Sequence, residues 1–185
     1  MKHLLKITFA LLAIVLGTAA SAQTTGAYLK YDLDGKTISY KAADLGMYNN
    51  YNPGTETTKT SNRFVLYYPA YKKGPYYLSF TIYVPAHTAP VVGKIPFVEE
   101  QFLRLNDPFP SAFLELTKSV GKESEFYASK TSSKGYFEIT KVSGGWVEGK
   151  FELDMPKQFE SDGNEVLHIT NGTFRFKIEK ETRSE

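Results

Sequence analysis

Tyrosine is the residue type whose distribution most suggests a binding site in this chain. Twelve of the thirteen tyrosines precede Gly135, and five of them lie between residues 67 and 77. A tyrosine ring offers apolar area together with a hydroxyl group, which is the combination that a sugar or a small amphipathic ligand requires. The candidate ligand-binding residues, from this cluster and from the polar segment before it, are Tyr48, Tyr51, Tyr67, Tyr71, Tyr76 and Tyr77.

The same tyrosines also have a purely structural interpretation. Strands favour tyrosine, and aromatic pairs on neighbouring strands stabilise a sheet by about 0.2–1 kcal/mol each. The two interpretations differ in where the rings lie. A binding site requires that they line one concavity, whereas a structural role lets them scatter through the sheets.

Residue types for metal or nucleophilic chemistry are scarce. The chain has no cysteine, and apart from His3 it has two histidines, His87 and His168, which lack the spacing of metal ligands. His168 alternates with apolar neighbours, which places it on the solvent side of a strand, and His87 lies in a proline-rich loop. No G-x-S-x-G nucleophile motif is present. We therefore expect no catalytic residue, no metal and no cofactor.

The first 22 residues have the pattern of a signal peptide. Lys2 and Lys6 give a positive start, an apolar run follows from Ile7 to Leu16, and Ala20-Ser21-Ala22 forms a cleavage site. The apolar run is shorter than the ~20 residues that a spanning helix needs. We therefore expect export to the periplasm or the extracellular medium, with no transmembrane segment in the mature chain and no cysteine to carry a lipid anchor.

Residues 23–185 have the length and charge of one globular domain without a nucleic-acid partner. Cleavage removes two lysines and no acid, so the formal net charge falls from +2 to 0. A nucleic-acid partner needs an excess of lysine and arginine on one face. A chain of this length buries roughly 70% of its unfolded surface, which is enough for a core without disulfides.

Apolar and charged residues alternate from Gly135 to Ile178, which predicts strands with one buried face. The apolar positions are Phe137, Ile139, Val147, Phe151, Leu153, Met155, Leu167, Ile169, Phe174, Phe176 and Ile178. These positions change from odd to even numbers around Asn171-Gly172. A two-residue hairpin turn would explain the change, and so would a β-bulge with Gly172 at positive φ. The long run from Trp146 to Met155 favours the bulge, because it can pair with one continuous strand.

Strand and turn signals continue through the rest of the chain. Asp34-Gly35 between two apolar runs predicts a hairpin. Residues 45–62, rich in asparagine and threonine, predict a long exposed loop, and residues 97–105 fit either a strand or a short helix. In total we expect about nine or ten strands and little helix. This pattern predicts an all-β fold, an antiparallel β-sandwich or barrel in a single domain over residues 23–185.

Several short elements have a recognisable pattern. They are Gly135 with the alternating strand after it, Gly149 with Phe151, Ile169-Thr170-Asn171-Gly172 with Phe174, and the opening hairpin. These elements resemble those of a family of small exported bacterial β-proteins of unassigned function, lipocalin-like or β-sandwich in type. The resemblance implies the fold and export, and it supplies no catalytic or binding residue. Many such relatives are anchored through a lipid-bearing cysteine, which this chain lacks.

Three hypotheses about function follow. The first is an exported, non-catalytic β-protein that binds a glycan or small amphipathic ligand through tyrosine-rich loops. The second is a structural or protein-partner module of the cell envelope that pairs through exposed strand edges or faces. The third is a hydrolase that uses two carboxylates, which the sequence leaves open because such a pair is defined by its separation in space. Glu99 and Glu100 are adjacent, but neighbours on a strand point to opposite faces.

Overall fold

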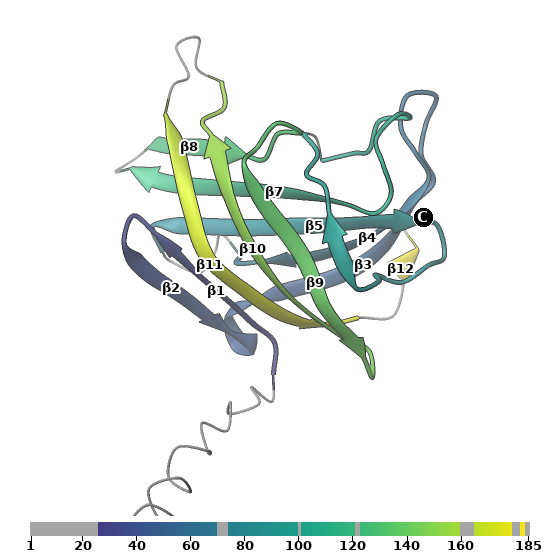
Figure 1. Cartoon of the computed structure of the whole chain (residues 1–185), viewed down its shortest axis with the longest axis horizontal. Coiled ribbons are helices and arrows are strands. Elements are labelled where there is room, and N and C mark those ends of the chain that lie inside the picture. The colour runs from purple at the N-terminus through teal and green to yellow at the C-terminus, as the bar shows by residue number, and fades with distance from the viewer. Residues whose placement is uncertain are drawn as a thin grey trace, which may run out of the picture.

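Two β-sheets face each other in this protein, and their strands run across one another (Figure 1). The computed structural model describes residues 26–69, 74–99, 101–120, 123–159, 165–178 and 182–183. The first sheet is built from β1 (Tyr28–Leu33), β2 (Lys36–Lys41), β6 (Gly93–Ile95), β9 (Gly135–Ser143), β10 (Trp146–Pro156) and β11 (Val166–Lys177). The second sheet is built from β3 (Gly46–Asn52), β4 (Ser61–Tyr67), β5 (Tyr76–Pro85), β7 (Ser111–Val120), β8 (Glu123–Ala128) and β12 (Thr182–Arg183).

The strand orders identify the fold as a β-sandwich. The first sheet has the order β2-β1-β11-β10-β9-β6, and the second has the order β12-β3-β4-β5-β7-β8. The named strands pair antiparallel, except that the two-residue β12 pairs parallel with β3. One helical element, the 3-10 turn η1 (Ala42–Asp44), occurs in the described part of the chain. The all-β prediction is confirmed, and of the two architectures left open by the sequence the sandwich is present, not the closed barrel.

Phenylalanine rings fill the space between the two sheets. Phe80 of β5 lies at the centre of this cluster, with its ring centroid 4.7 Å from that of Phe174 and 5.3 Å from that of Phe137. Phe151 and Phe176 lie further out, at 6.4 and 6.0 Å from Phe80. All five side chains are fully buried. One residue of the second sheet therefore contacts three strands of the first, β9, β10 and β11.

Two glycines make room for these rings within the first sheet. Gly149 pairs with Phe174 across β10 and β11, and Gly172 pairs with Phe151. A Cβ atom on Gly149 would lie 2.3 Å from the Phe174 ring, and one on Gly172 would lie 2.7 Å from the Phe151 ring. Each ring thus occupies the space of a missing side chain on the neighbouring strand.

The change from odd-numbered to even-numbered apolar positions near residue 171 is caused by a β-bulge, as the sequence favoured, and not by a hairpin turn. β11 runs unbroken from Val166 to Lys177, and its residues Thr170 and Asn171 together lie opposite the single residue Glu152 of β10. This arrangement inserts one extra residue into the strand. The residue with positive φ is Asn171, at 52°, so the expectation that Gly172 would adopt this conformation is wrong. Asparagine tolerates positive φ better than most residues with a side chain.

The bulge keeps the apolar residues on both sides of it in the core. Leu167 and Ile169 before the bulge are buried, and so are Phe174 and Phe176 after it. Without the extra residue, strict alternation would direct one of these pairs into solvent. The Asn171 side chain fixes the bulge to β1, because its Nδ2 donates a hydrogen bond to Asp32 Oδ2 at 2.8 Å.

Three further segments test the sequence predictions. The hairpin is confirmed, with Asp34 and Gly35 at positive φ between β1 and β2. The prediction of a long loop over residues 45–62 holds for residues 53–60 but is wrong for residues 46–52, because β3 pairs along all seven of its residues with β4 despite its asparagine content. The described residues 97–99 and 101–105 form neither a strand nor a helix, and contribute isolated bridges at Phe97 and Arg104. None of the described segments is a helix with the length and apolarity needed to cross a membrane.

Replacing Asn171 with valine is expected to destabilise the fold. A β-branched side chain strongly disfavours positive φ, and strain of this kind costs on the order of 1–3 kcal/mol. We expect Asn171→Val to lower the free energy of unfolding in urea by about 2 kcal/mol. Asn171→Gly relieves the strain and should lose much less. Thr170→Val, at the neighbouring exposed position, is the control, and equal losses for both valine variants would contradict the bulge.

Candidate functional site

The outer face of the second sheet carries a groove with a floor of small side chains. Leu78 points into the core, so alternation along β5 directs Tyr77, Ser79 and Thr81 to the outer face. Thr81 and the neighbouring Val65 of β4 are buried at the base of the groove. We call this feature the tyrosine groove. Its volume is about 360 Å³, and it is lined by Tyr48, Val65, Tyr67, Tyr68, Tyr77, Ser79, Thr81, Gln101, Glu115 and Thr117.

Strand register explains why the groove is hollow. Tyr67 of β4, Ser79 of β5 and Glu115 of β7 lie directly opposite one another in a row across three strands. Neighbouring strands are about 4.8 Å apart, so the backbones at Tyr67 and Glu115 are about 10 Å apart. The small Ser79 side chain lies between them. The large residues on β4 and β7 and the small residue on β5 between them leave an open space over β5.

The rings that border the groove are held by contacts on their other sides. Gly46 of β3 pairs with Tyr67, and a Cβ atom on Gly46 would lie 2.2 Å from the Tyr67 ring. The Tyr48 ring meets the Tyr67 ring edge to face, with centroids 6.1 Å apart. Tyr68 and Tyr77 stack at 5.8 Å. Side chains that are already ordered lose less conformational entropy when a ligand binds.

Tyr68 connects the margin of the groove to the first sheet. Its ring stacks on that of Tyr40 of β2, with centroids 4.0 Å apart and planes 18° apart. The Tyr40 hydroxyl in turn donates a hydrogen bond to the backbone carbonyl of Tyr76 at 3.1 Å. Burial raises the pKa of Tyr40, and desolvation together with the nearby Asp44 carboxylate raises the pKa of Tyr68. Both side chains are therefore neutral phenols at pH 7.

Polar groups face the rings from β7 and from the segment before it. Ser79 Oγ donates a hydrogen bond to Glu115 Oε1 at 2.9 Å, which orients the carboxylate. Gln101 is held through its backbone carbonyl, which accepts a hydrogen bond from the hydroxyl of the buried Tyr83. Thr117 contributes a further hydroxyl group. None of the described residues that line the groove is a lysine or an arginine.

The structure brings together half of the six tyrosines that the sequence proposed as ligand-binding residues. Those that line the groove are Tyr48, Tyr67 and Tyr77. Tyr76 alternates to the inner side of β5 and packs against the core. Tyr51 stacks on the exposed His87, with centroids 5.1 Å apart, and does not line the groove. Tyr71 lies outside the described residues.

The expectation of tyrosine-rich loops is wrong for the three predicted tyrosines that line the groove. Tyr48 belongs to β3, because that part of the segment expected to be a loop is itself a strand, and Tyr67 and Tyr77 belong to β4 and β5. Tyr68 and the small residues of the floor were not among the candidates predicted from the sequence. A usable signal was present on the outer face of β5, where Tyr77 is followed by two small residues at alternate positions.

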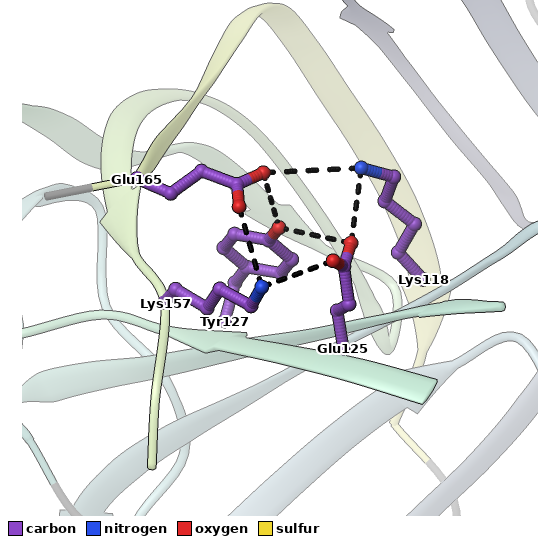
Figure 2. A network of polar contacts seen from close by, with 5 residues as sticks. All are labelled: Lys118, Glu125, Tyr127, Lys157 and Glu165. Carbon is purple, nitrogen blue, oxygen red and sulfur yellow. Dashed lines mark hydrogen bonds and ion pairs between the residues drawn. The ribbon is translucent and has the colours of Figure 1, made fainter. Parts of the chain in front are cut away.

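A second cluster of ionisable groups connects the two sheets at one end, and we call it the polar network (Figure 2). Lys118, Glu125 and Tyr127 come from β7 and β8, whereas Lys157 follows β10 and Glu165 precedes β11. Lys157 Nζ lies 3.0 Å from Glu125 Oε1 and 3.3 Å from Glu165 Oε2. Lys118 Nζ lies 3.0 Å from Glu125 Oε2. The Tyr127 hydroxyl donates a hydrogen bond to Glu165 at 2.6 Å.

The polar network has the electrostatics of a structural connection. Hydrogen bonds from Lys157 and Lys118 lower the pKa of Glu125 to about 2, and the hydrogen bond from Tyr127 is the largest cause of the lowered pKa of Glu165. A hydrolase of the carboxylate type needs one carboxyl group with a raised pKa as its acid. Both carboxylates here are held ionised, so the polar network does not support the hydrolase hypothesis.

The histidines lie at the surface, as the sequence predicts. His168 Nδ1 lies 2.7 Å from Asp154 Oδ1 on the neighbouring strand, and His87 is exposed. Within the described part of the chain, no group of three or more histidine, aspartate and glutamate side chains is arranged to hold a metal ion.

Comparison with known proteins assigns no function to either cluster. The chain matches no protein-family model, no curated protein sequence and no solved structure. The resemblance to small exported β-proteins therefore stays a prediction.

The polar network is expected to lose its stabilising effect in acid. The folded-state pKa of Glu125, about 2, lies below its ordinary value of 4.5. Its contribution is therefore complete above about pH 4.5 and is lost as the pH falls towards 2. In urea titrations at pH 7, 5 and 3, we expect the difference in unfolding free energy between the native chain and Glu125→Gln to shrink by about half or more at pH 3.

A matched control separates this effect from general acid sensitivity. Glu138 pairs with Lys150 at 3.2 Å on the outer face of the first sheet, away from the polar network. The difference between the native chain and Glu138→Gln should be small at every pH, because surface ion pairs contribute about 0–1 kcal/mol. A constant difference for Glu125→Gln from pH 7 to pH 3 would contradict the assignment.

Proposed function

We propose that the mature chain is an exported binding protein that holds a glycan or another small amphipathic ligand in the tyrosine groove. The observation that supports this most directly is the convergence of Tyr48, Tyr67 and Tyr77, from three strands, on one groove of about 360 Å³. Ligand pockets commonly have volumes of about 300–1,000 Å³. Tyrosines that served only to stabilise a sheet would pack against one another without bordering an open space.

The chemistry of the lining fits an amphipathic ligand. The rings offer faces and edges to the apolar side of a sugar or to an alkyl chain. Ser79, Gln101, Glu115 and Thr117 provide hydrogen-bond donors and acceptors for hydroxyl groups. A small number of polar groups within a mainly aromatic lining is typical of sites that bind small molecules.

Binding without catalysis is proposed because the groove lacks a recognisable reactive arrangement. Glu115 is the only carboxylate among the described residues that line it, whereas glycoside hydrolysis uses a pair. The described lining also contains no histidine that could act as a general base for Ser79. The oriented Glu115 carboxylate is then a group that recognises the ligand.

Export is part of the proposal. The positive start, the apolar run and the A-x-A site within residues 1–22 support a signal peptide, and these residues lie outside the part that the structure describes. The resemblance to exported β-proteins points in the same direction. We place the mature chain in the periplasm or the extracellular medium, where glycans and amphipathic molecules are available.

A protein-partner module of the cell envelope is the second candidate, and one observation favours it. Phe159 is 92% exposed, and its ring meets that of the exposed Phe126 edge to face at 6.1 Å. Exposed aromatic side chains of this kind are typical of interfaces. The two candidates are distinguished by the groove, because partner binding through Phe126 and Phe159 does not require the tyrosines on the outer face of β3, β4 and β5.

A dye-displacement titration tests ligand binding in the groove. N-phenyl-1-naphthylamine, a neutral fluorescent amphiphile, should bind the mature chain, and octyl β-glucoside should displace it. We expect Tyr48→Ala and Tyr77→Ala each to weaken binding roughly fivefold, because each removes about 1 kcal/mol of contact with a partly exposed ring. Circular dichroism and thermal unfolding establish that the variants fold.

Tyr136 provides the matched control for this titration. It is a partly buried tyrosine of β9, on the outer face of the first sheet, so Tyr136→Ala removes a similar ring from the opposite side of the molecule. Its affinity for the probe should equal that of the native chain. Absence of probe binding, or equal losses for Tyr77→Ala and Tyr136→Ala, would overturn the proposed function.

A further inference from the structure

We infer that the tyrosine groove selects a ligand carrying an alkylated ammonium group, such as a trimethylammonium head, over a neutral ligand of the same shape. This inference rests on the proposed function and specifies the chemical class of its ligand. It follows from three features of the groove: aromatic rings without a cation of their own, a carboxylate opposite them, and a hollow of suitable width.

The first feature becomes clear by comparison with other aromatic side chains of the molecule. Elsewhere, rings lie next to lysine or arginine side chains of the same chain. The pairs are Lys59 with Phe109, Arg63 with Phe102, Lys94 and Lys150 with Tyr136, and Arg175 with Trp146. Among the described residues, no lysine or arginine lies over the ring of Tyr48, Tyr67 or Tyr77. No described cation of the protein therefore competes with a ligand for the negative faces of these rings.

The second feature is the carboxylate of Glu115. It is exposed on β7, accepts a hydrogen bond from Ser79 and forms no ion pair with any described lysine or arginine. The glutamates of the polar network, by contrast, are each paired with lysine. Glu115 therefore contributes a negative charge to a groove whose described lining has no positive one. A cationic ligand gains from both the carboxylate and the negative faces of the rings.

The third feature is the width of the hollow. The row from Tyr67 over Ser79 to Glu115 spans two strand spacings, about 10 Å between backbones. A trimethylammonium group is broad and weakly hydrated, so it can rest on the small Ser79 side chain with a ring on one side and the carboxylate on the other. Sugar hydroxyls would also satisfy Glu115, which makes a neutral ligand the competing outcome.

A pair of probes of the same shape tests the inference. Choline and 3,3-dimethylbutan-1-ol differ mainly in that a charged nitrogen replaces a carbon atom. We expect choline to bind the mature chain at least tenfold more tightly than its neutral analogue, measured by chemical-shift titration in two-dimensional NMR spectra. Raising the salt concentration should weaken choline binding and leave the neutral analogue unaffected, because only the charged probe is screened.

Two variants separate charge from shape. Glu115→Gln keeps the size of the side chain and its hydrogen bond with Ser79 but removes the charge, so it should weaken choline binding at least fivefold and change the affinity for 3,3-dimethylbutan-1-ol much less. Tyr48→Leu keeps apolar area but removes the aromatic ring, and should also reduce the preference for choline. Glu152→Gln, an exposed glutamate on the first sheet, is the control and should change nothing.

The outcomes distinguish this inference from the proposed function. Equal affinity for the two probes, or no effect of Glu115→Gln on choline, overturns the inference while binding of octyl β-glucoside still supports the function. Failure of every probe overturns both the inference and the proposed function.

Sedimentation with phosphatidylcholine vesicles, compared with phosphatidylglycerol vesicles, shows whether the ammonium group is carried by a lipid. Competition by free choline in that assay supports the inference, and vesicle binding that choline does not inhibit counts against it.

Discussion

The contact of Phe80 with phenylalanine rings of the first sheet is the constraint on which the rest of the structure depends. Phe80 comes from the middle of the second sheet and meets rings from three strands of the first, so it sets both the separation and the alignment of the two layers. Gly149 and Gly172 accept two of those rings, and a side chain at either position would overlap both a ring and the backbone of a neighbouring strand. The bulge at Asn171 then keeps the apolar residues of β11 on the inner face.

The same constraint determines what the outer face of the second sheet displays. Side chains alternate along a strand, so an inward Phe80 requires that Ser79 and Thr81 point outwards. The register of the neighbouring strands places Tyr67 and Glu115 on either side of Ser79. Gly46 accepts the Tyr67 ring in the way that Gly149 accepts a ring in the core. The groove is therefore a consequence of the packing on the opposite face of its own sheet.

These relations also explain how much could be predicted from the sequence. The alternating C-terminal strands and the bulge were predictable, because a period of two and its interruption at Asn171 are local properties. Strand β3 was not predictable, because its asparagine-rich composition is typical of a loop. It is a strand because it pairs with β4, which its own composition does not indicate. The convergence of Tyr48, Tyr67 and Tyr77 was also inaccessible, because it depends on which strands are neighbours and on the small residues between them. Tyr76 shows the limit clearly: it adjoins Tyr77 in the sequence and points the other way.

The tyrosine groove and the polar network combine the same residue types with different consequences. Each contains tyrosine and glutamate, but the network adds Lys118 and Lys157, so its charges balance and its hydrogen bonds close within the protein. Such groups hold two sheets together and have little capacity left for a ligand. In the groove the described lining supplies no lysine. Glu115 accepts a hydrogen bond from the Ser79 hydroxyl group. On the function proposed for the groove, the two clusters differ in whether the chain provides the counter-charge itself or leaves it to the ligand.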